Sequence, residues 1–152
     1  MDKILFVKEE FLKLISSLSP DAKGKWGKMN AQQMVEHMSY SFRLASGRHV
    51  EKSFLTPEQT QKGYSFVMTD KSFRENTQNP LLSPEPDTIK NSSMSAAIEG
   101  LKAEINYFFE VYDSNKELRI INPFYGNLNF EEQVQLLHKH CEHHAKQFGL
   151  VE

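Results

Sequence analysis

Four of the six histidines in this chain fall within seven positions near its C-terminus, at His138, His140, His143 and His144. Their segment is predicted to be helical, so His140 and His144 lie one turn apart and point the same way. Two imidazoles at this spacing can bind one metal ion without bending the backbone, because the ion accepts ring nitrogens at ~2.0–2.1 Å. His37 lies on a second predicted helix, far away in the sequence. A metal site therefore depends on whether these three rings meet.

A helical wheel at about 100° per residue separates the four clustered histidines. His144 falls within the apolar stripe of its helix, and His140 lies on the flank of that stripe, next to Gln147. His143 lies at the solvent boundary and His138 on the opposite flank. A buried neutral imidazole needs partners for both ring nitrogens, and a metal ion would supply one of them. The pattern therefore favours His140 and His144 as the inward-facing pair.

His37 lies at the edge of the apolar stripe of its own helix, from which its ring can reach the pair if the two helices are neighbours. Three histidine donors leave a fourth position for water or substrate, as in catalytic zinc sites, whereas structural sites usually close the shell with a fourth protein ligand. Three imidazoles accept zinc, nickel, copper or iron, so the pattern does not name the metal. The metal-free alternative is a helical protein whose histidines are hydrogen-bonded core residues.

Two other residues occur once each and could carry chemistry. Cys141 falls among buried positions, so it is predicted to be an inert core thiol. As the only cysteine it allows no internal disulfide, and a cysteine-based zinc cluster is excluded. Trp26 precedes the second helix and is predicted to plug one end of the core rather than to contact a ligand.

Four segments with helical periodicity must position these residues. They cover residues 4–18, 30–46, 92–112 and 129–148. Asn30 and Gln33 have the spacing of a capping box at the start of the second segment, and Gly47 is a plausible stop. The same capping pattern recurs at Asn129 and Glu132. Four amphipathic helices with little strand signal predict an all-α four-helix bundle, forming a single domain over residues 1–152.

A connection of about 45 residues joins the second and third predicted helices, which is long for a compact domain. Such a connection can be a crossover from one end of a bundle to the other. Thr56 and Pro57 predict the start of a short helix reaching toward Val67, whereas residues 76–92 are predicted to be irregular. Residues 118–121 are predicted to form a short extended piece before a turn at Gly126.

The bulk properties exclude several classes of function. The net charge is −2, which argues against nucleic acid as the main partner. No apolar run approaches the ~20 residues that cross a bilayer, so no membrane association is expected. The N-terminus lacks a signal-peptide pattern and a single reduced thiol suits the cytosol, so a cytoplasmic protein is expected.

Two segments resemble the DinB/YfiT-like superfamily. Residues 26–38, WGKMNAQQMVEHM, resemble the segment leading to that superfamily's first histidine, and residues 140–147 resemble its His-x-x-x-His-x-x-Gln ending. Residues 122–128, NPFYGNL, resemble the turn before the last helix in a DinB-related branch of unknown function. The usual Arg-Gly between the final histidine and Gln is replaced by Ala145-Lys146.

The resemblance implies that His37, His140 and His144 bind a divalent metal, zinc or nickel. Members of the superfamily are thiol-dependent transferases or isomerases that use a low-molecular-weight thiol, or are described only as metal-dependent hydrolases, and homodimers are common. The expected function is therefore a metal-dependent enzyme acting on a small-molecule substrate, either by activating water or by presenting a thiolate. Gln147 is expected to orient a histidine or the bound water. The alternative is a non-catalytic metal- or ligand-binding bundle of a stress-response type.

Overall fold

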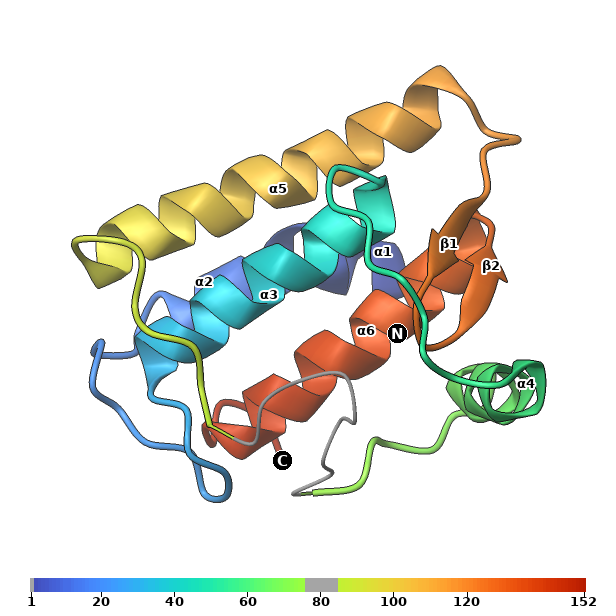
Figure 1. Ribbon diagram of the computed structural model, residues 1–152. Helices are drawn as coiled ribbons and strands as arrows, with labels where there is room; N and C mark the ends of the chain where they lie inside the picture. Colours follow the sequence, from blue (N-terminus) through green and yellow to red (C-terminus); the bar gives the residue numbers. More distant parts are fainter. Residues whose placement is uncertain (1, 76–84) are drawn as a thin grey trace.

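The computed structural model describes residues 2–75 and 85–152 (Figure 1). Its N-terminal helix is formed by three consecutive pieces: α1 (Lys3–Leu5), a π-helical turn η1 (Phe6–Glu10) and α2 (Phe11–Ile15). This helix confirms the first predicted segment, although it ends at Ile15 rather than at residue 18. The π turn is a single wide turn between two α-helical pieces, too short to interrupt the apolar periodicity of the whole segment.

Three long helices carry most of the structure: α3 (Ala31–Ser46), α5 (Met94–Ser114) and α6 (Phe130–Gln147). Asn30 and Gln33 form the predicted capping box at the start of α3, and α3 ends at Gly47, whose φ of 79° is left-handed. Asn129 and Glu132 form the equivalent box at the start of α6. Each box satisfies backbone N–H groups that the first turn of a helix leaves without partners. The predicted starts of α3 and α6 are therefore confirmed.

The connection between α3 and α5 contains a further helix, α4 (Pro57–Val67). Thr56 caps it together with Gln59, and Pro57 occupies its first position, where a missing N–H is harmless. The predicted short helix is therefore confirmed. Of the stretch predicted to be irregular, residues 76–84 lie outside the described part of the chain, and residues 85–92 contain no helix or strand.

A two-stranded antiparallel sheet follows α5. Strands β1 (Ile120–Asn122) and β2 (Gly126–Leu128) pair with Ile120 opposite Leu128, and Gly126 turns the chain with a φ of 88°. The prediction of an all-α four-helix bundle is therefore wrong, because the structure combines helices with a small sheet. Each strand has three residues, which is too short for an alternating pattern to be visible in the sequence.

The main core lies where the N-terminal helix, α3, α5 and α6 meet, and Figure 1 shows α3 between α5 and α6. Aromatic rings fill one part of it, with Phe108 in contact with Phe42, Tyr112 and Phe130. A smaller cluster of Val67, Leu128 and Leu136 joins α4 and the sheet to α6. Within residues 2–75 and 85–152, no helix has the length and apolar character needed to cross a membrane.

Candidate metal centre

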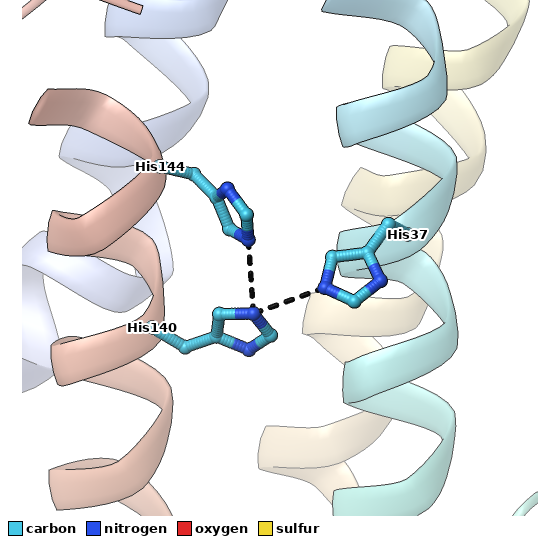
Figure 2. Close-up of side chains that lie close together, drawn as sticks. All are labelled: His37, His140 and His144. Atoms are coloured by element: carbon cyan, nitrogen blue, oxygen red, sulfur yellow. Dashed lines mark hydrogen bonds between the residues drawn. The ribbon is translucent and has the colours of Figure 1, made fainter. Parts of the chain in front are cut away.

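Three imidazole rings from two helices converge in the structure. His37 projects from α3, and His140 and His144 project from α6 one turn apart (Figure 2). The Nε2 atom of His140 lies 3.0 Å from Nε2 of His37 and 3.0 Å from Nε2 of His144. The ligand nitrogens of all three side chains lie within 4.8 Å of one another. The predicted convergence of these rings is therefore confirmed.

The spacing of the nitrogens fits a metal ion. A tetrahedral ion with nitrogen ligands at ~2.0–2.1 Å holds neighbouring nitrogens about 3.3 Å apart, close to the distances observed here. Small side-chain rotations that move these nitrogens by a few tenths of an ångström would bring them to that separation. Neutral imidazole is a common ligand of zinc, nickel, copper and iron, so the donor set fits a divalent transition metal. The three residues can therefore hold such an ion.

Gln147 determines which nitrogen of His144 is available. Its amide Nε2 donates a hydrogen bond to the carbonyl oxygen of Trp26 at 2.9 Å, so its Oε1 is the atom that faces His144. His144 Nδ1 lies 2.7 Å from that oxygen and must carry the proton. Nε2 of a neutral His144 then bears a lone pair directed at the cluster. This is how partners of metal-binding histidines orient the ring and select its tautomer.

The three rings cannot satisfy one another by hydrogen bonding. Both short contacts involve Nε2 of His140, and a neutral imidazole carries at most one proton there. One of the two contacts is therefore left without a hydrogen bond of its own. The cluster therefore needs a partner from outside the three rings, and an ion accepting all three lone pairs would provide one. Hydrogen bonding among the three histidines alone does not satisfy them.

Burial keeps these rings neutral. Desolvation lowers the pKa of His37 to about 4. Burial, followed by the neighbouring imidazoles, lowers the pKa of His140 well below its usual range, and burial likewise lowers the pKa of His144. A neutral imidazole is the form that binds a metal, so the site does not have to lose protons before binding at neutral pH.

The cluster opens onto a cavity of about 600 Å³, a size typical of small-molecule sites. His144 is almost fully buried, whereas His37 and His140 are partly exposed. All three line the cavity, whose walls are largely aromatic and aliphatic. The aromatic wall residues are Trp26, Tyr40, Phe73, Phe124 and Tyr125. A ligand in this cavity would therefore contact both the metal-binding nitrogens and apolar surface.

Trp26 differs from its predicted role. It is half-buried, lines the cavity, and its ring centroid lies 5.6 Å from that of His143. The prediction that it plugs the core is therefore wrong. Glycines at positions 24 and 27 were the available signal, because they allow the loop to approach Gln147 closely.

Four carboxylates line the cavity, at Glu36, Glu51, Glu85 and Asp87. Glu36 accepts hydrogen bonds from the backbone N–H groups of Lys90 and Asn91, which fastens this loop to α3. Burial raises the pKa of Glu36 and these hydrogen bonds lower it, with a net downward shift. The residues that Glu36 contacts lie more than fifty positions away in the sequence, so no local pattern indicates this role. Glu36 therefore shapes the wall of the cavity.

The remaining histidines and the thiol have other surroundings. His138 packs edge-on against Phe6, and His49 contacts Glu51 at 2.9 Å. Cys141 is fully buried, and desolvation raises the pKa of its thiol. It is therefore the inert core thiol that its position predicted.

No protein-family model matches the chain, and no curated protein or solved structure is significantly similar to it. The relation to the DinB/YfiT-like superfamily stays a prediction. What the site can do is therefore argued from its own geometry.

Proposed function

We propose that this protein is a metal-dependent enzyme in which His37, His140 and His144 hold a divalent ion, zinc or nickel, beside a small-molecule substrate. One observation carries the proposal: three Nε2 atoms converge at the wall of a cavity large enough for a substrate. A DinB/YfiT-like relationship is part of the proposal and is supported by the arrangement of one histidine on α3 and two on α6.

The ligand count favours catalysis over a purely structural role. Among the described residues, no cysteine, carboxylate or further histidine joins the three imidazoles within ligand distance. Three protein ligands with an accessible fourth position are typical of catalytic zinc, whereas four protein ligands are typical of structural zinc. The position not taken by protein faces the cavity, where a substrate can reach it.

A bound ion would supply Lewis acidity, which supports either hydrolysis or transfer of a low-molecular-weight thiol to an electrophile. The chain's own contribution is positional. Gln147 holds His144 in the tautomer that presents Nε2, and aromatic side chains form part of the wall that a substrate would contact. Both reaction classes use this arrangement, so both belong in the test.

A second candidate is a non-catalytic module that binds a metal or ligand. It is favoured by the state of the cavity's four carboxylates, which are candidates for a general base, because three of them are engaged in other contacts. Glu36 holds the loop at Lys90 and Asn91, Glu51 contacts His49, and Glu85 pairs with Lys28 at 2.5 Å. An enzyme built on this site would therefore rely mainly on the ion to activate its nucleophile.

The test combines metal analysis with activity assays. The protein is purified with zinc, nickel or manganese, its metal content is measured by elemental analysis, and thiol transfer and ester or amide hydrolysis are assayed. His144→Ala is expected to lose both the metal and turnover, whereas His49→Ala, outside the cluster, keeps both. Turnover by a metal-free His144→Ala protein would contradict the proposal. Stoichiometric metal without turnover in either assay would favour the non-catalytic candidate.

A further inference from the structure

The loop that precedes α3 is fastened to the C-terminal end of α6. The backbone N–H of Lys25 donates to the carbonyl oxygen of Gln147 at 2.7 Å, and the Gln147 side chain donates to the carbonyl of Trp26 at 2.9 Å. A bridge between Lys23 and Asn30 closes the base of this loop. Gln147 is 3% exposed, so water cannot replace these bonds if they break.

Two glycines allow the loop to come this close. A Cβ atom at Gly24 would lie 2.8 Å from Cγ of Gln147 and 2.8 Å from the carbonyl oxygen of Trp26. A Cβ at Gly27 would lie 2.8 Å from Nε2 of Gln147, and the φ of 78° at Gly27 is also unfavourable for other residues. The backbone of the loop is therefore fitted around this one amide side chain.

The same amide connects two functional parts of the cavity. Its oxygen accepts the Nδ1 proton of His144, and its nitrogen holds the residue whose ring lines the cavity wall. Hydrogen bonds in a buried chain polarise one another, so a stronger bond at one end strengthens the bond at the other. An ion on Nε2 of His144 makes Nδ1–H a stronger donor to Oε1, which in turn makes the amide N–H a stronger donor to the Trp26 carbonyl.

We propose that Gln147 couples metal binding to the position of Trp26, so that an occupied site and an ordered aromatic wall stabilise each other. This inference rests on the proposed metal site. Coupling between two binding events is reciprocal, so a change that displaces the Trp26 loop weakens metal binding, and metal binding changes the surroundings of Trp26. Gln147 is thus a positioning residue that acts in two directions.

The only tryptophan of the chain is the one in this loop, so its fluorescence reports on the loop alone. Zinc is titrated into the metal-free protein while Trp26 emission is recorded, and zinc affinity is measured separately by competition with a chelator. Zinc absorbs no visible or near-ultraviolet light and so does not quench by energy transfer. In the wild-type protein the emission maximum is expected to shift to shorter wavelength with the same midpoint as zinc binding.

Two variants test separately the two contacts of the Gln147 amide, one with His144 and one with the Trp26 carbonyl. Gln147→Glu keeps an acceptor for His144 Nδ1 but cannot donate to the Trp26 carbonyl, so it is expected to bind zinc without the emission shift. This variant also controls for a direct effect of the ion's charge on the indole. Gly24→Ala displaces the amide, so its zinc affinity is expected to fall about 10–100-fold, the loss typical when the partner of a ligand is disturbed.

Gly100→Ala is the matched control, because a Cβ atom there meets nothing within 4 Å. It is expected to match wild type in affinity and in emission. Circular dichroism of each zinc-free variant checks that the fold is intact, and Gln147→Glu keeps the test valid if Gly24→Ala does not fold. Wild-type protein that binds zinc without an emission shift, or Gly24→Ala protein with unchanged affinity, would overturn the coupling but not the metal site. Wild-type protein that binds no divalent ion would overturn both.

Discussion

Two clusters of buried polar side chains lie next to each other on α6 and are satisfied in opposite ways. Lys139 donates to the carbonyl oxygens of Thr69 and Lys71, and the Gln135 amide donates to the carbonyls of Val67 and Thr69 at 3.0 Å. Every donor here faces a backbone acceptor. One residue further along, the ring of His140 faces the nitrogens of two other rings.

The difference separates polar side chains that hold the fold together from polar side chains that are available to a ligand. Lys139 is 5% exposed, and burial lowers its pKa. Its ammonium group donates hydrogen bonds to backbone carbonyls of the segment after α4, and these bonds hold that segment against α6. The histidine cluster differs, because a single proton on Nε2 of His140 can serve only one of the two short contacts that this atom makes. A buried polar group with saturated hydrogen bonds stabilises the fold, whereas convergent ring nitrogens are available to bind a cation. Substitutions in each cluster, and at the far end of α6, test this difference.

The largest effect is expected for His140→Ala. Nε2 of His140 takes part in both short contacts of the cluster, so its removal leaves two ligands that no longer share a centre. Zinc affinity is expected to fall more than about 100-fold, beyond the loss caused by disturbing a residue that only orients a ligand. Equilibrium dialysis against buffered zinc measures this. An affinity within ten-fold of wild type would show that the ion binds elsewhere.

Lys139→Met tests the other cluster. The carbonyls of Thr69 and Lys71 lose a buried donor, so the free energy of unfolding is expected to fall by about 1–3 kcal/mol. Zinc affinity should stay unchanged, because this side chain points toward the segment after α4 and not toward the rings. Urea unfolding monitored by circular dichroism provides the measurement. A loss of zinc affinity comparable to that of His140→Ala would remove the distinction between the two clusters.

The stability of the zinc-free protein is expected to depend on pH. The pKa of His37 drops from its ordinary 6.5 to about 4 in the folded state, so the unfolded chain takes up a proton that the folded one resists. Stability is therefore full above pH 6.5 and declines as the pH falls from 6.5 toward 4. Unfolding free energies measured across this window in His37→Asn should decline less steeply, whereas Lys139→Met should keep the wild-type slope. Equal slopes in wild type and His37→Asn would contradict the neutral, buried state of this ring.

The smallest effect concerns the opposite end of α6. Asn129→Ala removes the side chain that accepts the Glu132 N–H and is expected to cost about 1 kcal/mol of unfolding free energy. About five turns of helix separate this cap from Gln147, so zinc affinity should match wild type. Thermal unfolding together with the chelator competition assay tests both expectations. A weakened zinc site would mean that α6 responds as a whole rather than through separate contacts.

Features with short-range signals were predictable from the sequence. The capping boxes at Asn30 and Asn129 depend on residues three positions apart, and the turn spacing of His140 and His144 depends on helix geometry alone. The meeting of His37 with this pair was predicted only on the condition that the two helices are neighbours, which their amphipathic stripes permit but do not specify.

Features built from distant segments were not predictable in this way. Strand β1 was recognised only as an extended piece, because nothing in its three residues specifies a partner across the turn. Trp26 was assigned to the core because a large apolar ring is usually buried, whereas its actual position depends on Gln147, more than a hundred residues away. Contacts of this kind are set by tertiary packing and produce no periodic pattern in the sequence.

The burial of Cys141 bears on which metal would suit the proposed site. Sulfur ligands give proteins their preference for soft ions such as copper(I), and the only thiol of the chain is buried in the core and does not join the three imidazoles. An ion held by His37, His140 and His144 would therefore be bound through ring nitrogens, a donor set that suits borderline cations such as zinc or nickel.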